Sequence, residues 1–360
     1  MAGMALADSG IMRAAMTSKT ATPLPSTNRQ ITLAARPVGM PKESDFRMVT
    51  APVPLLSEGQ VLARTIFLSV DPYMRGRMTG VRTYADPVDI GQVMVGGTVG
   101  EILQSRSGEF QAGDIVVGYW GWQEFGVVDA KGLRKLDTRM ALPSTALGVL
   151  GMPGMTAYFG LLEIGQPKMG ETVVVSGAAG AVGSLVGQIA KIRGCRAVGI
   201  AGSDEKVSWL VKELGFDAAF NYKTTPDYVA RLKELCPSGI DCYFDNVGGT
   251  VSDAIFPLIN TKARIAVCGQ ISQYNLAHPD PGPRILGHLL TKGARAEGFL
   301  VYQFADRFPE GMAQMALWIR EGKLKYREQI VEGLENAPQA LIGVLRGDNV
   351  GKMLVRISPL

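Results

Sequence analysis

The sequence predicts an α/β protein in which a doubly wound parallel sheet is joined to a compact β-barrel-like domain. From Thr172 onward, short apolar runs alternate with segments of helical periodicity, which is the pattern of a parallel sheet covered by helices on both faces. Between Arg29 and about Leu150 the runs are β-rich, short and separated by glycine and proline. The 360 residues leave room for two such domains.

Residues 1–27 are expected to form a flexible tail, or to reflect a start codon placed too early. The segment carries four methionines among alanine, serine and threonine, without sustained periodicity. Asp8, Arg13 and Lys19 interrupt the continuous apolar stretch that a secretory signal needs, while a mitochondrial presequence stays open.

The first domain is predicted to consist of strands, with no helix-rich core. Its expected strands are residues 30–34, 60–70, 97–104, 114–120 and 123–128. Residues 143–164 are then expected to form helix and loop. Far along the chain, residues 352–357 alternate apolar and charged side chains as a strand does, so this segment can return to the first domain and close its sheet.

The parallel sheet is predicted to have six strands separated by helices. They are residues 172–176, 197–200, 218–221, 241–245, 264–268 and 296–301.

A glycine-rich break follows the first of these strands. Gly177, Gly180 and Gly183 stand three residues apart, and helical periodicity begins at Val182. Such a triplet alone is also typical of a structural turn, but strand, tight loop and helix in this order leave free N–H groups at the helix start. A pyrophosphate can approach the backbone there, at the positive end of the helix dipole.

The second strand carries the residues that predict the kind of dinucleotide. An NAD site usually has Asp or Glu after this strand to bind the ribose 2′-hydroxyl. This chain has Gly202 and Ser203 instead, followed by Lys206 within one helical turn. A 2′-phosphate is therefore favoured, which predicts NADP(H), unless Lys206 is an ordinary solvated lysine.

Polar residues, glycines and one phenol follow the remaining strands. Because ligands collect beyond the carboxyl ends of the strands in a doubly wound sheet, these residues are candidates for binding. Singly, each is also a plausible turn residue or cap. The candidates are Asn221, Tyr222, Asn246, Gly248, Gly249, the run Gly269, Gln270, Ile271, Ser272, Gln273 and Tyr274, and then Phe299, Leu300 and Val301.

Composition and charge argue against several other classes of protein. A formal charge of +4 without a basic cluster argues against nucleic acid or an anionic membrane as partner, and no stretch of 18 apolar residues is present. The cysteines show no paired spacing, which favours a reduced, cytoplasmic setting. His278 and His288 are far from any cysteine pair or carboxylate cluster, so no metal site is expected.

Six motifs in order resemble the zinc-free medium-chain dehydrogenase/reductase superfamily, and within it the group of prostaglandin reductases, alkenal double-bond reductases and curcumin reductases. The resemblance covers nearly the whole chain after residue 28, and two further motifs come from the barrel domain. The eight strings are GMPGMTAYFGL (151–161), SGAAGAVGSLVGQIAKIRGC (176–195), AGSDEKV (201–207), GFDAAFNYK (215–223), FDNVGG (244–249), CGQISQYN (268–275), SVDPYMRGRM (69–78) and GKMLV (351–355).

The resemblance implies a GroES-like catalytic domain (28–150 plus 328–360) around a Rossmann domain (151–327) that binds NADPH. Zinc-dependent relatives carry a cysteine and a histidine as ligands in the barrel domain, and this one has neither. Residue by residue, the resemblance places the cofactor against Gly180, Ala181, Val182, Gly183, Lys206, Tyr222, Asn246, Cys268, Gly269, Gln270, Ile271, Ser272, Gln273, Tyr274, Phe299, Leu300, Val301 and Asn349.

The implied reaction is reduction of the carbon–carbon double bond of α,β-unsaturated ketones and aldehydes. Hydride passes to the β-carbon, and a donor must stabilise the enolate oxygen. The donor is a tyrosine hydroxyl or the ribose hydroxyl of the cofactor. Tyr274 is the first candidate, since it follows a strand at the nicotinamide end and stays protonated with an ordinary pKa of about 10; Tyr73, in the DPYM turn, is the second candidate.

Other functions stay open at this point. A quinone oxidoreductase of the same superfamily would use the same cofactor and cleft, and a non-catalytic NADPH-binding protein would keep the glycine loop. A reversible alcohol oxidation is harder to reconcile with the missing metal. The family also leads us to expect a homodimer, paired through the sheet edge near residues 296–301. The substrate pocket comes from loops whose shape the sequence does not predict.

Overall fold

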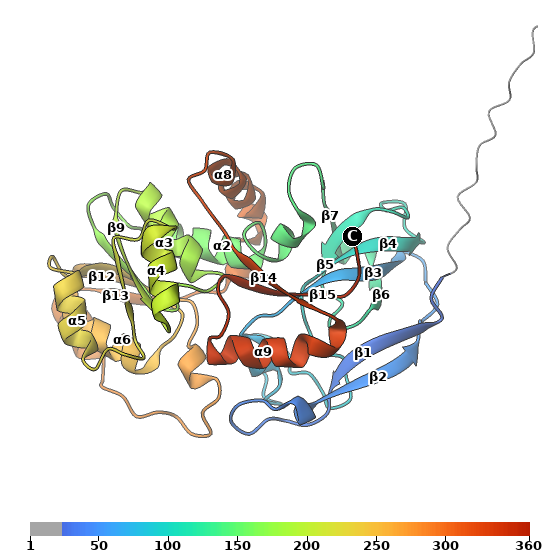
Figure 1. Ribbon diagram of the computed structural model, residues 1–360, viewed down its shortest axis with the longest axis horizontal. Helices are drawn as coiled ribbons and strands as arrows, with labels where there is room; N and C mark the ends of the chain where they lie inside the picture. The colour runs from blue at the N-terminus through green and yellow to red at the C-terminus, as the bar shows by residue number, and fades with distance from the viewer. Residues whose placement is uncertain (1–23) are drawn as a thin grey trace, which may run out of the picture.

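The computed structural model describes residues 24–360, so the expectation for residues 1–23 lies outside the described residues. Two large sheets lie side by side, joined by the central helices and by the C-terminal strands (Figure 1). A separate two-stranded ribbon pairs β1 (Thr27–Leu33) with β2 (Phe46–Pro52). The predicted fold class, a doubly wound parallel sheet plus a second β-rich unit, is confirmed.

The first large sheet is parallel throughout, in the order β10-β9-β8-β11-β12-β13. Its strands lie at the predicted places; β10 has the predicted bounds, and the ends of the others differ from prediction by up to five residues. They are β8 (Thr172–Val175), β9 (Arg196–Ala201), β10 (Ala218–Asn221), β11 (Ile240–Asp245), β12 (Ile259–Val267) and β13 (Arg295–Gly298).

Successive residues of the central strand β8 face opposite sides of this sheet. Val173 and Val175 belong to one apolar cluster and Val174 to another, as the alternation of side chains along a strand requires. Both faces are therefore covered, which explains why the strand is a continuous apolar run. The first cluster packs against α2 (Met152–Phe159), α3 (Gly183–Ile192), α4 (Asp204–Lys212) and α8 (Phe308–Arg320), and the second against α5 (Tyr228–Leu235), α6 (Gly249–Ile255) and α7 (Leu286–Lys292).

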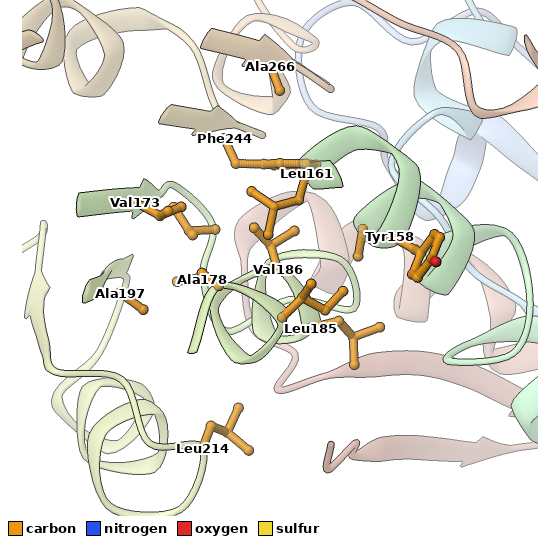
Figure 2. Packing of buried hydrophobic residues seen from close by; sticks show 14 of the residues in the cluster. Tyr158, Leu161, Val173, Ala178, Leu185, Val186, Ala197, Leu214, Phe244 and Ala266 are labelled. Carbon is orange, nitrogen blue, oxygen red and sulfur yellow. The ribbon is translucent and has the colours of Figure 1, made fainter. Parts of the chain in front are cut away.

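Figure 2 shows the first of these clusters between the sheet and the helices. Val173 and Phe244 come from neighbouring strands, and Leu185 and Val186 come from α3. The side chains are buried, so the start of α3 is held rigidly against the end of β8.

The second large sheet has seven strands and is antiparallel except where β14 runs parallel to β15. Its strands are β3 (Gln60–Ser69), β4 (Thr98–Ser105), β5 (Ile115–Gly118), β6 (Phe125–Asp129), β7 (Arg134–Lys135), β14 (Glu328–Glu332) and β15 (Lys352–Arg356). The helices α1 (Met74–Arg77) and α9 (Ala337–Arg346) accompany this sheet.

Further helical turns, mostly of 3-10 type, lie between these elements. They are Glu43–Asp45, Ala130–Gly132, Pro143–Leu147, Gly160–Gly165, Phe256–Leu258, Ile271–Gln273, Val301–Arg307 and Leu334–Asn336.

The C-terminal strand returns to the second sheet as the sequence predicted. β15 pairs antiparallel with β3, so the last residues of the chain join strands from its first third. Just before β15, Gly351 forms an isolated bridge with Gly180 of the glycine loop. This contact brings the two sheets together at the site described next. The domain boundaries themselves stay a prediction.

Candidate functional site

A cavity of about 1190 Å³ lies between the two large sheets. It brings together most of the residues that the sequence singled out. These are Tyr73, Gly180, Ala181, Val182, Gly183, Lys206, Tyr222, Asn246, Cys268, Gly269, Ile271, Ser272, Tyr274, Phe299, Leu300, Val301 and Asn349. Gln270 and Gln273 are not among the residues that line it; Gln270 is exposed, and the Gln273 amide donates to Ser272 Oγ at 3.1 Å.

The glycine loop leaves backbone donors facing the cavity. Among the described residues, the N–H groups of Ala181, Val182 and Gly183 make no backbone hydrogen bond, whereas Ser184 N–H already donates to Gly180 O at 3.1 Å. A Cβ at Gly183 would lie 2.4 Å from Gly177 O, so only glycine allows this tight approach of loop and helix. The start of α3 is thereby shaped to hold an anionic group such as a pyrophosphate.

Lys206 lies at the far end of the cavity and is not a solvated surface lysine. It is only 9% exposed, and its Nζ donates to the Gly347 carbonyl oxygen. Burial, followed by the nearby charge of Lys223, lowers the pKa of Lys206. The Lys223 side chain and the Tyr222 ring lie beside Gly202, and the Lys223 charge acts on Lys206, so this part of the cavity favours a further anion.

Ser203 has a structural role in the same region. Its hydroxyl accepts a hydrogen bond from Lys206 N–H at 3.3 Å and caps α4. The helix start, and with it Lys206, is fixed by this cap.

Asp245, which the sequence analysis did not single out, organises the carboxyl ends of β8 and β11. Its buried carboxylate accepts from Tyr243, Ser252 and Ser176 hydroxyls at 2.8, 2.7 and 3.1 Å, and from two backbone N–H groups. Next to it, the Asn246 amide donates to Ser176 O at 2.7 Å. The motif FDNVGG points only to the family resemblance. It does not reveal the contact with Ser176, which lies 69 residues from Asp245 in the chain, whereas Tyr243 and Ser252 lie two and seven residues away.

The Tyr274 hydroxyl lies at the end of β12, where it accepts a hydrogen bond from Gln270 N–H at 3.2 Å. Burial raises the pKa of Tyr274 above its ordinary value, and the Gln270 N–H opposes this shift. The phenol is therefore protonated at neutral pH. Since its oxygen is used as the acceptor toward Gln270, its O–H is free to donate to another group in the cavity.

Tyr73 lines the same cavity from the other sheet. It follows β3 in the DPYM turn and precedes α1, and burial, then the nearby Asp71 charge, raises its pKa. Four further phenols that were not among the predicted catalytic or cofactor-binding residues also line the cavity: Tyr84, Tyr119, Tyr228 and Tyr302. The hydroxyls of Tyr119 and Tyr302 are 2.9 Å apart and join the two sides of the cleft.

The cysteines are free and the described residues hold no group of three potential metal ligands. Cys268 lines the cavity, and burial raises the pKa of its thiol to about 12, so it is a weak nucleophile. In residues 24–360, no helix has both the length and the apolar character needed to cross a lipid bilayer.

Two family models match the chain. The model of the N-terminal domain of oxidoreductase matches residues 29–136, and the model of zinc-binding dehydrogenase matches residues 181–318. With the two-sheet fold and the glycine loop in the intervening cavity, these matches define an oxidoreductase of the medium-chain dehydrogenase/reductase superfamily.

Comparison with individual relatives identifies the subgroup of this superfamily to which the chain belongs. It is 49% identical over 336 residues to the NADPH-dependent curcumin reductase of Escherichia coli (strain K12), covering 92% of this chain and 97% of that protein. It is 44% identical over 336 residues to the NADP(+)-dependent 2-alkenal reductase of Nicotiana tabacum, covering 92% and 98%. The crystal structure of CurA in complex with NADPH from Vibrio vulnificus aligns with a TM-score of 0.89 at 47% identity, over 92% of this chain and 100% of that one. The chain belongs to the alkenal and prostaglandin reductase group.

Proposed function

We propose that the protein reduces the carbon–carbon double bond of α,β-unsaturated ketones and aldehydes with NADPH. The main observation is a single cavity that is lined both by a glycine loop with free backbone donors and by protonated phenols. The relatives that are named as NADPH-dependent curcumin reductase and as 2-alkenal reductase support this assignment.

The residues of the cavity fit NADP(H). The loop Gly180, Ala181, Val182 and Gly183 would hold the pyrophosphate, with the N–H groups of the last three as donors, because Gly180 N–H already donates to Gly177 O. Lys206 with Tyr222 would bind the phosphate of the ribose. Asn246, the segment from Cys268 to Tyr274, the end of β13 and Asn349 would bind the remainder. When bound, the reduced nicotinamide supplies the hydride for the β-carbon of the substrate.

Tyr274 would then act on the oxygen of the substrate. A conjugated carbonyl accepts a hydride only when its oxygen is polarised, and charge develops on that oxygen as the enolate forms. A protonated phenol whose O–H is free can donate to this oxygen. The α-carbon is protonated afterwards from solvent or from the phenol. Tyr73 is the second candidate, from the opposite wall of the cavity.

We also propose that two copies of the chain pair through β13. Within residues 24–360, this strand has β12 on one side and no strand on the other, and all four of its residues are exposed.

We further propose a reduced, cytoplasmic setting, because the four cysteines of the chain are free.

The test of the activity is a panel of unsaturated aldehydes, unsaturated ketones and quinones, followed by the absorbance of NADPH, with NADH beside it. Oxidation of NADPH by open-chain enones, with a saturated carbonyl product, is expected. Turnover of 1,4-benzoquinone alone would support a quinone oxidoreductase instead. No oxidation with any acceptor would point to a binding protein.

A further inference from the structure

One short segment, residues 349–353, contacts both walls of the cavity. Gly351 N–H donates to Ala179 O at 2.8 Å, which fixes the segment to the glycine loop. Gly351 has φ of +70°, and a Cβ there would lie 2.1 Å from Arg327 O, so this contact depends on glycine. The next residue, Lys352, begins β15 and reaches the opposite wall.

The ammonium group of Lys352 is buried and fully hydrogen-bonded. Lys352 is 4% exposed, and its Nζ donates to Val70 O and Met353 O, both at 2.7 Å, and lies 3.1 Å from Asp71 Oδ1. A lysine has three N–H donors, so these partners account for all of them. Asp71 is 6% exposed and also accepts from the Ser69 hydroxyl. Each buried charge therefore depends on the other.

The ion pair lies two residues before Tyr73. Asp71 is followed by Pro72, whose ring restricts the backbone, and the turn continues with Met74 N–H donating to Asp71 O at 3.1 Å. Because the chain from Asp71 to Met74 has little remaining freedom, a displacement of Asp71 would carry Tyr73 with it. Lys352 does not need to touch the substrate to affect where the phenol lies.

We propose that Lys352 is a positioning residue for Tyr73: its ion pair with Asp71, together with the Gly351 contact, sets the distance between the glycine loop and the DPYM turn. The proposal rests on the proposed function, in which the phenol of Tyr73 faces an enone in the cavity. The Lys352–Asp71 ion pair thus affects the substrate through Tyr73, while the residues proposed to bind NADPH keep their own contacts.

The test uses Lys352→Met, which removes the charge and keeps an unbranched side chain. We expect kcat/KM for an open-chain enone to fall about tenfold or more, the range found for coupled neighbours. The Kd of NADPH, measured by quenching of tryptophan fluorescence, stays within about twofold. In a Tyr73→Phe background, Lys352→Met should lower kcat/KM much less than in the wild-type enzyme, since it acts through the phenol.

Two further variants separate this role from a purely structural one. Lys135→Met removes another lysine that is ion-paired with a buried aspartate of the same sheet, Asp114, at 2.5 Å but remote from Tyr73, and should leave kcat/KM unchanged. The double variant Lys352→Met with Asp71→Asn removes both charges of this ion pair and serves if the single variant does not fold.

Three results would overturn the proposal: an unchanged kcat/KM, equal losses in NADPH binding and in turnover, or effects of Lys352→Met and Tyr73→Phe that simply multiply. An unmodified enzyme that is inactive on every enone would instead contradict the proposed function itself, and the inference with it.

Discussion

The Tyr274 phenol has a hydrogen-bond arrangement that suits a donor. Its oxygen accepts from Gln270 N–H, and burial keeps the proton on the phenol by raising its pKa. A hydroxyl that already accepts a hydrogen bond is a better donor toward a second group, because the bonds polarise one another. Among the side chains that line the cavity, Tyr274 therefore has the hydroxyl best suited to donate a hydrogen bond to the developing enolate oxygen.

Tyr274→Phe is expected to lower kcat for an open-chain enone by about 10²-fold, the typical contribution of a general acid. The Kd of NADPH should be nearly unchanged, because the ring stays in place. Tyr326→Phe, outside the large cavity, is the matched control and should have normal turnover. Unchanged turnover of the Tyr274→Phe enzyme would remove this phenol from the mechanism and favour a ribose hydroxyl of the cofactor as the donor.

Lys206→Ala is expected to weaken NADPH binding by at least about tenfold and NADH binding by much less, since a hydrogen bond to a charged group contributes about 1.5–3 kcal/mol. The reason is that only NADPH carries the 2′-phosphate that a buried ammonium would neutralise. Fluorescence titration of both cofactors measures the two affinities. Lys212→Ala, at the other end of α4, is the control. Equal losses for the two cofactors would contradict the role of Lys206 in choosing between them.

Site residues that belong to a local sequence motif could be predicted from the sequence. Residues whose role depends on partners far away in the chain could not. Lys206 and Tyr222 lie in short motifs after predicted strands, and both line the cavity. Asp245 sits in an equally short motif, but its partner Ser176 lies 69 residues away in the chain and is brought to it by the pairing of β8 with β11. Tyr119 and Tyr302 are 183 residues apart in the chain, and no local pattern relates them.

At the level of elements, strands that are buried on both faces could be predicted well. β8 is a continuous apolar run with glycine after it, and β10 was predicted with its observed bounds. Three strands, β2, β7 and β14, were not predicted. In β2 only the first residue is fully buried, and β14 is a short run with three charged or amide side chains among its five residues. Strands paired at an edge lack the apolar pattern that marks buried ones.

The close packing of α3 on the sheet gives an element-scale prediction. A Cβ at Gly187 would lie 1.9 Å from Phe216 Cζ, whereas Gly287 in α7 has no heavy atom within 4 Å of such a Cβ. Gly187→Ala should therefore destabilise the fold by about 1–3 kcal/mol through overpacking. Gly287→Ala should stabilise it by about 0.5–1 kcal/mol, the helix propensity of alanine over glycine. Urea unfolding measures both, and similar unfolding of the two variants would contradict the packing argument.

At the scale of the whole molecule, the site forms because the C-terminal part of the chain returns to the second sheet. β15 pairs with β3, and Gly351 then meets Gly180 across the cleft. The alternation of charged and apolar residues in 352–357 predicted a strand that closes the sheet of the first domain, which is the second large sheet. It did not predict that the residues just before this strand would hold the glycine loop, since that contact depends on how the two sheets pack.

Pairing of two copies through β13 is the prediction at this scale. The free edge of this strand presents unpaired N–H and C=O groups, which a second copy can satisfy by continuing the sheet. In α7, which contacts the neighbouring strand β12, Leu286 and Leu290 lie one turn apart and are 73% and 83% exposed, so a dimer that covers them would also remove apolar surface from water.

Leu290→Glu should shift sedimentation of the protein from a dimer to a monomer at micromolar concentration, because the partner would bury an unpaired carboxylate. Leu55→Glu, at another leucine that is 94% exposed, should leave the dimer intact. Since the cavity of one chain contains both the glycine loop and the phenols, the monomer is expected to keep binding NADPH. A wild-type protein that sediments as a monomer, or a Leu290→Glu protein that sediments as a dimer, would show that this edge is not the interface.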